Sequence, residues 1–178
     1  MRTSFDVLRS LKRYVAIALG EEWEVRLQAE EGTFSRPAAI ITDAPGGQTI
    51  DGPRRAMDIV QTFSINAFPV PGPSVMESLE AASEVEETLV QAFRVGEGEG
   101  KATRVPLYDY DSVPVTDGST SRHRPDYARI LDLSVGRPQS PSDELLFTVT
   151  AEVRLGWRRN ADVPLTGRTA NEIRFDYS

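Results

Sequence analysis

The sequence contains no cysteine and a single histidine, His123, among its 178 residues. Without cysteine the chain cannot form disulfides, use a thiol as a nucleophile or bind a metal through thiolates. One histidine cannot build the usual histidine-rich zinc or iron site within one chain. We therefore expect no cofactor and no metal site.

Long apolar runs are also missing, because the longest are short pieces such as Val15–Leu19. A membrane-spanning helix needs about 20 consecutive apolar residues, so we expect no membrane partner. The first six residues, Met-Arg-Thr-Ser-Phe-Asp, contain neither an apolar signal core nor a small-residue cleavage site. Export is therefore not indicated.

Acidic residues outnumber basic ones, and the formal net charge is −7. Sequence-independent binding to nucleic acid depends on neutralising phosphates, so an acidic chain is a poor candidate for it. The hydrophobic fraction of 39% and the charged fraction of 26% are those of an ordinary globular protein. We expect a single domain over residues 1–178, with loops near 43–55, 96–104 and 113–125.

The first segment with helical periodicity is Ser4–Leu19, with Thr3 or Ser4 as its N-cap and Gly20 as its stop. Its apolar residues recur at helical spacing, and its polar face is basic. The predicted apolar face consists of Phe5, Leu8, Leu11, Val15 and Leu19, and the basic face of Arg2, Arg9, Lys12 and Arg13.

A second helix is predicted from Ser74 to about Phe93, because Ser74-Val-Met-Glu77 forms a capping box. Four glutamates are expected on its polar face, while Glu86 falls unexpectedly within the apolar stripe. The apolar face is predicted to contain Val75, Leu79, Ala82, Leu89 and Phe93, and the acidic face Glu77, Glu80, Glu84 and Glu87.

The remaining segments with regular patterns have strand character. Ile59, Phe63 and Ile65 fall on one face of a strand, which Gln61 shares, and such one-sided alternation is typical of an antiparallel sheet with one covered face. We predict an α+β fold, a mainly antiparallel sheet with two amphipathic helices packed on one face. The predicted strands are Trp23–Leu27, Ala38–Ile41, Ile59–Ala67, Val105–Tyr110, Ala128–Val135, Leu146–Trp157 and Ile173–Tyr177.

Three segments contain residues that could serve catalysis or ligand binding, but each lacks part of what such a site requires. Gly96–Gly100 is rich in glycine, but it is acidic and follows a helix, whereas a phosphate loop follows a strand. Asp109 and Asp111 share a strand face but lack the fuller set of oxygen ligands that Mg²⁺ or Ca²⁺ requires. His123, between two arginines, has no nucleophile signature to act upon. We expect a protein that is not an enzyme.

The acidic face of the second helix is more informative. Like charges at helical spacing cost roughly 0.2–0.5 kcal/mol per pair, so this face is either a solvated surface or the partner of a basic one. The chain supplies basic residues near both ends, and complementary patches on one chain suit head-to-tail contacts between identical copies. Glu86 is either paired within the fold or placed at a subunit contact, and we favour the contact. The predicted subunit interface contains Glu77, Glu80, Glu84, Glu86, Glu87, Arg9, Arg13, Arg158 and Arg159, with Arg154 and Arg168 as further basic residues.

Three features of the layout carry a resemblance. An N-terminal amphipathic helix, Ser4–Leu19, leads into Trp23–Leu27. A strand ends in a proline-rich turn, Thr62–Pro73, before a long acidic helix. A closing strand, Leu146–Trp157, is followed by two arginines. In this layout the chain resembles the tail terminator (head–tail joining) proteins of long-tailed bacteriophages.

The resemblance implies a virion structural protein without catalytic activity. Such proteins form a homo-oligomeric ring, usually a hexamer, that caps the tail tube, stops its polymerisation and joins it to the head connector. The implied partners are further copies of the chain, the tail tube protein and the head–tail connector protein. DNA would pass through the lumen without sequence-specific binding. The implied location is the virion, after assembly in the host cytoplasm.

Other functions stay open. One is another neck or tail-completion protein with a similar fold. A second is a non-enzymatic binding module that uses the segment Asp43–Arg55 and the loop Arg122–Arg124 for recognition. The least favoured is a small metal-dependent hydrolase that uses Asp109, Asp111 and His123.

Overall fold

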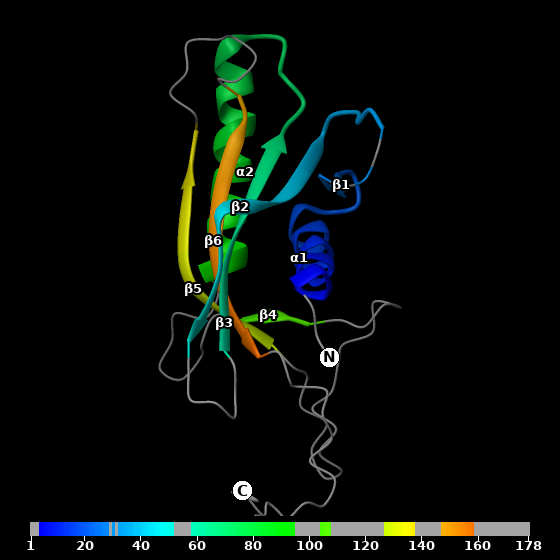
Figure 1. Ribbon diagram of the computed structural model, residues 1–178. Coiled ribbons are helices and arrows are strands. Elements are labelled where there is room, and N and C mark those ends of the chain that lie inside the picture. The colour runs from blue at the N-terminus through cyan, green and yellow to red at the C-terminus, as the bar shows by residue number, and fades with distance from the viewer. Residues whose placement is uncertain are drawn as a thin grey trace, which may run out of the picture.

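The computed structural model describes residues 4–28, 30, 32–51, 58–94, 104–107, 127–137 and 147–158, with the backbone alone at 44–51, Asp58, Arg94 and Arg158. Helices and strands follow one another along this part of the chain (Figure 1). They are α1 (Ser4–Leu19), β1 (Glu24–Leu27), β2 (Ala38–Asp51), β3 (Asp58–Phe68), α2 (Val75–Arg94), β4 (Arg104–Pro106), β5 (Tyr127–Gly136) and β6 (Val149–Arg158).

The six strands form one sheet in the order β1-β2-β3-β6-β5-β4. β1 and β2 run parallel, and Glu24 pairs with Ala38, because after β1 the chain returns to the same end of the sheet before β2 begins. The other four pairs of strands are antiparallel. The predicted α+β class is therefore confirmed, with a mixed sheet that is mainly antiparallel.

Both helices cover the same face of the sheet. Every second side chain of β3 and β6 is buried, and these inward residues, apart from Gln61, form one apolar cluster with residues of α1 and α2. Figure 1 shows α2 running along the sheet behind β6. The helices also contact each other, since the rings of Tyr14 and Phe93 lie 5.4 Å apart between centroids and the Tyr14 hydroxyl donates to the Ala92 carbonyl. The opposite face carries polar side chains such as Ser64 and Glu152.

The predicted helix ends are confirmed at both sites where the structure describes them. The backbone N–H of Glu77 donates to Ser74 Oγ at 3.2 Å, and the N–H of Ser74 donates to Glu77 Oε2 at 3.1 Å, which is the reciprocal bonding of a capping box. At the end of α1, Gly20 adopts a φ of 96°, and its N–H donates to the Ala16 carbonyl at 3.1 Å. A left-handed residue at this position favours glycine.

The predicted loop near 43–55 is wrong over its first part, because β2 continues to Asp51. Asp43 pairs with Phe63 and Gln48 with Gln61, so the four residues between them on β2 oppose a single residue of β3. Such an irregularity accommodates Pro45 and the two glycines after it without ladder hydrogen bonds at those residues. Pairing with β3 outweighs their local preference for a turn.

Two residues predicted for the core are exposed. Phe5 is 51% exposed, because it lies about 200° around the helix from Val7, one of the residues that α1 buries. Val75 is 67% exposed, because the first turn of α2 extends past the end of β3 (Figure 1). The buried face of α2 instead begins at Ser78, whose hydroxyl donates to the Ser74 carbonyl at 2.9 Å.

Several predicted segments lie outside the described residues. These are the loops at 96–103 and 113–125, the end of the predicted loop at 52–55 and the strand Ile173–Tyr177. Of the predicted strand Val105–Tyr110, β4 accounts for the first two residues. No helix in the described ranges is long and apolar enough to cross a membrane.

Candidate functional site: the outer faces of the two helices

The acidic face of α2 is exposed as predicted. Glu77, Glu80, Glu84 and Glu87 all lie on the solvent side of the helix, opposite the buried stripe. Glu77 also serves the capping box, and Glu87 accepts a hydrogen bond from Gln91 Nε2 at 3.0 Å. In a single subunit, these glutamates would be exposed both on a solvated surface and at an interface. Their part in a subunit contact therefore remains a prediction.

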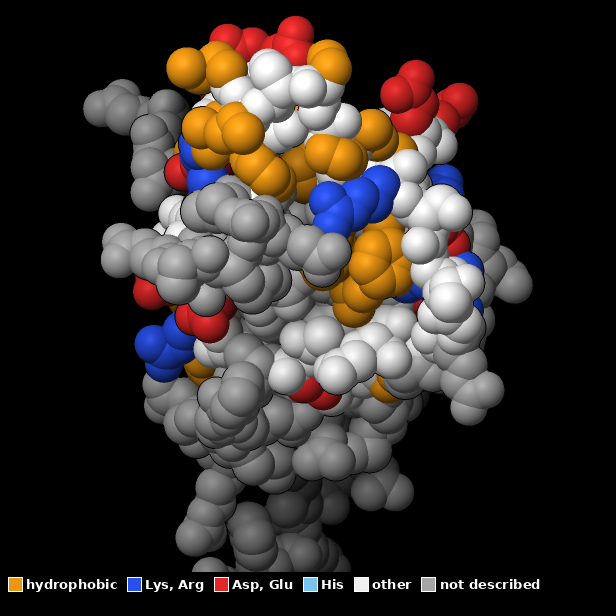
Figure 2. All heavy atoms as spheres, turned by 90° about the horizontal axis from the view of Figure 1, so that it is seen from above, with side chains coloured by type: hydrophobic (Ala, Val, Ile, Leu, Met, Phe, Trp, Pro, Cys, Tyr) orange, Lys and Arg blue, Asp and Glu red, His pale blue; other side chains and the backbone are white. Residues whose placement is uncertain are grey.

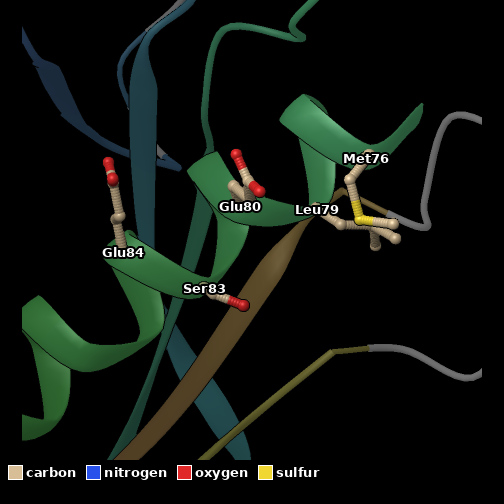
Figure 3. A pocket seen from close by; sticks show the side chains of 5 residues that line it. All are labelled: Met76, Leu79, Glu80, Ser83 and Glu84. Atoms are coloured by element: carbon tan, nitrogen blue, oxygen red, sulfur yellow. The ribbon is translucent and has the colours of Figure 1, made fainter. Parts of the chain in front are cut away.

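An open groove of about 390 Å³ lies along this face, within the first half of α2. Its walls are Met76, Leu79, Glu80, Ser83 and Glu84, all from one side of the helix (Figure 3). The residue spacing of three and four places them on adjacent turns. The groove is therefore apolar at its N-terminal end and acidic further along.

Apolar side chains gather around the N-terminal end of this groove. Met76 is 66% exposed, and Val70 in the turn before the helix is also exposed, as are Pro71 and Pro73. Figure 2 shows hydrophobic side chains grouped on this end of the molecule, with carboxylates close by. The groove thus continues into an exposed apolar surface.

Glu86 is paired within the fold. Arg137 Nε donates to Glu86 Oε2 at 3.2 Å, and Arg137 Nη2 donates to Ser83 Oγ. Both partners of the salt bridge keep about a third of their side-chain surface exposed. The carboxylate therefore lies at the flank of the apolar stripe, and its pairing is the first of the two predicted alternatives. Its presence at a subunit contact is untested.

The outer face of α1 carries a second unusual stripe, at every fourth residue. Arg9 and Arg13 are exposed, and so are Phe5 and Ile17 on either side of them, Ile17 to 59%. Residues four apart lie nearly above one another on a helix, so the order along this stripe is apolar, basic, basic, apolar. The apolar ends of the stripe were not anticipated, although the helical spacing contained them.

Lys12 is set apart from this stripe by an ion pair. Its Nζ lies 2.6 Å from Glu30 Oε1, and Glu30 Oε2 accepts the N–H of Leu27 at 2.8 Å. Partial burial alone would raise the pKa of Glu30, but the hydrogen bonds from Lys12 and Leu27 outweigh it and the pKa is lowered. This cluster ties α1 to the end of β1.

Of the basic residues near the C-terminal end, Arg154 does not join those of α1. Arg154 is exposed on the outward face of β6, opposite Asp132 and Thr62, and so lies on the other side of the sheet from the helices. Arg158 ends β6 and is described by its backbone alone. Arg2, Arg159 and Arg168 lie outside the described residues.

A buried amide links the start of α1 to the sheet. Ser4 Oγ donates to Gln61 Oε1 at 2.8 Å, and Gln61 Nε2 donates to Asp43 Oδ1 at 3.0 Å. Burial raises the pKa of Asp43, against the opposing effect of the Gln61 hydrogen bond. Gln61 was predicted on the inward face, and these bonds explain how a polar side chain is accommodated there.

The residues considered for chemistry lie outside the described ranges, including Gly96–Gly100, Asp109, Asp111 and the segment Arg122–Arg124 with His123. Their predicted roles stay predictions. Among the residues that the structure describes, no three His, Asp or Glu side chains are grouped so that they could hold a metal ion.

Comparison with known proteins finds similarity at the level of structure. No protein-family model and no curated protein matches the sequence. A solved structure that is similar is a sheath/tube terminator of an extracellular contractile injection system (PVC) in the extended state, determined by cryo-EM. The likeness covers 100% of this chain and 65% of that chain, with a TM-score of 0.40 and 12% sequence identity. This chain thus spans just under two thirds of the length of that protein.

Proposed function

We propose that the chain is a virion structural protein that assembles into a ring of identical subunits on the end of a tail tube. The ring stops further polymerisation of the tube and joins it to the head connector. Six subunits are proposed, with DNA passing through the lumen without sequence-specific contacts. No catalysis is involved.

The observation that carries this proposal is the separation of charge between the two helices. An acidic outer face on α2 and a basic outer face on α1 belong to one helical layer of the same subunit. Complementary surfaces at different places on one chain favour contacts that repeat from copy to copy.

The order of elements supports the assignment to a tail. The helix α1, the strand β1, the proline-rich turn after β3, the long helix α2 and the closing strand β6 follow the layout on which the resemblance to tail terminators rests. The related proposal of another neck or tail-completion protein shares this layout, and it differs in what the ring would bind.

A tube-capping assay tests the function. Purified tail tube protein from the same particle is polymerised with and without the chain, and tube lengths are measured by negative-stain electron microscopy. We expect shorter tubes that carry a ring at one end, and an unrelated acidic protein of similar size should leave the length unchanged. Rings that bind the connector but leave the tubes unaffected would favour another neck protein. A chain that stays monomeric even with tubes present would contradict both.

A further inference from the structure

We infer that the basic stripe of α1 in one copy packs into the groove on α2 of the next copy. The inference rests on the proposed function, because it names the contact through which the ring closes. The stripe consists of Phe5, Arg9, Arg13 and Ile17, and the groove of Met76, Leu79, Glu80, Ser83 and Glu84.

Charge and apolarity match along the two surfaces. On α2, Glu80 and Glu84 lie one helical turn apart, with Met76 one turn before them. On α1, Arg9 and Arg13 have the same separation, and an apolar residue lies one turn beyond each end of the pair. Both helices advance about 6 Å over four residues, so two arginines can face two glutamates while an apolar side chain meets Met76.

This match holds in both directions. With the helices antiparallel, Ile17 meets Met76, and with the helices parallel, Phe5 meets Met76. The two arginines oppose the two glutamates in either case. The stripe therefore specifies the partner surface, and the rest of the subunit selects the direction.

Within the residues that the structure describes, α1 does not fill the groove of its own copy. Its helices meet through Tyr14 and the C-terminal end of α2, where Phe93 and Ala92 lie. Tyr14 lies about 100° around α1 from Arg13, and the contact leaves the first half of α2 uncovered by α1. Within the described part of the chain, Arg13 makes no salt bridge. In the described part of the chain, the groove and Arg13 are therefore accessible to a second copy.

An arginine already binds beside the groove within one copy. Arg137 holds both Glu86 and Ser83, and Ser83 is also a wall of the groove. This pairing neutralises one flank and leaves Glu80 and Glu84 as the acidic residues of the groove itself. An arginine from another copy can therefore bind the carboxylates of Glu80 and Glu84, which lie one helical turn apart.

A charge swap in two variants tests the contact. We expect R9E/R13E and E80R/E84R each to associate with itself about tenfold or more weakly than the wild type, because each then presents like charges on both surfaces. Mixed in equal amounts, the two variants should assemble again, because each supplies the surface that the other lacks. Sedimentation velocity measures both effects, and circular dichroism checks the fold.

Cross-linking gives an independent readout, since the natural chain has no cysteine. Differently tagged chains carrying Ile17→Cys and Met76→Cys should form a disulfide when mixed, whereas Ser134→Cys on the outward face of β5 should not link to Met76→Cys. A Phe5→Cys variant that links to Met76→Cys instead would show the parallel arrangement and would equally support the contact. If the cysteine variants assemble as the wild type does but form neither link, the proposed contact is overturned.

The outcomes separate the contact from the proposed function. A chain carrying both Ile17→Cys and Met76→Cys (or Phe5→Cys and Met76→Cys, if the helices pack in parallel) should give a ladder of linked species that ends at the subunit number of the ring. A ladder that stops at two would support the helix contact and overturn the ring. Rings that form equally well from the charge variants would overturn the contact and leave the proposed function standing. A wild type that never assembles would overturn both.

Discussion

Gln61 illustrates how a single polar side chain can fix one helix against the sheet. It is 6% exposed and lies on the inward face between Ile59 and Phe63, yet both ends of its amide are hydrogen-bonded, one to Ser4 and one to Asp43. A buried amide that kept no partners would cost free energy, whereas this one anchors the first turn of α1.

Replacing Gln61 by Ala should lower the free energy of unfolding by about 1–3 kcal/mol, because the hydrogen bonds are lost and a cavity is left. Urea denaturation measures the change. Thr62→Ala, on the outward face of the same strand, is the matched control and should stay within about 0.5 kcal/mol of the wild type. Equal losses in the two variants would show that the amide has no special role.

Glu30 gives the molecule a pH-dependent contribution. Its pKa is lowered in the folded chain, so its ionised form is favoured by folding. The stabilisation is present above the ordinary value of 4.5 and is lost as the pH falls through the lowered folded pKa. Because the pair with Lys12 is substantially exposed, the contribution is at most about 1 kcal/mol.

We expect Glu30→Gln to be less stable than the wild type at pH 7 and equally stable once the pH lies below the folded pKa of Glu30. Urea denaturation between pH 7 and pH 2.5 follows this difference. Glu22→Gln, an exposed glutamate in the preceding turn, provides the control. A difference that stays constant over the whole range would mean that packing of the side chain, rather than its charge, is responsible.

At the scale of the elements, α2 depends on its first turn, which projects past the sheet and lacks support from the core. Ser74→Ala removes the hydroxyl that accepts the Glu77 N–H and should cost about 1 kcal/mol of stability. Thermal unfolding followed by circular dichroism should therefore give a lower Tm. Thr88→Ala, which removes a hydroxyl bonded to the Glu84 carbonyl within the helix, should change the Tm little. A Tm unaffected by Ser74→Ala would contradict the importance of the cap.

The sequence predicts elements well where one local signal dominates. The periodicity and Gly20 define α1 with its observed bounds, and the capping box places the start of α2. The extension of β2 to Asp51 could not be predicted, because it depends on pairing with β3 across an irregular segment that contains proline and glycine. Long-range pairing here decides what local preference cannot.

The candidate site was predicted in part for the same reason. The exposure of the glutamates follows from the periodicity of α2 alone. The groove depends on Met76, and the apolar surface beside it on Val75, whose exposure follows from where the sheet ends rather than from the spacing. Likewise, the pairing of Glu86 with Arg137 joins residues 51 positions apart, which no local pattern shows.

At the scale of the whole molecule, the acidic net charge makes assembly depend on local complementarity. Copies with a formal charge of −7 repel one another at long range, so association needs a contact in which opposite charges meet at short range. The outer faces of α1 and α2 carry the opposite charges of the contact proposed above, while the outward face of the sheet carries mixed polar residues. The helical layer is therefore the side of the subunit through which copies would meet.

Association of this kind makes thermal stability depend on concentration. Because a ring binds only folded subunits, the Tm of the wild type should rise as the protein concentration is raised. The Tm of R9E/R13E should rise less over the same range, since its α1 stripe repels the groove. Differential scanning calorimetry at a low and a hundredfold higher concentration measures both.

Salt at about 0.5 M should weaken the dependence of Tm on concentration by screening the ion pairs. It should not abolish the dependence, because the apolar ends of the stripe remain in contact. If the wild-type Tm does not depend on concentration although rings are present, the subunits must leave the ring before they unfold. That result would contradict a tight contact between the helices.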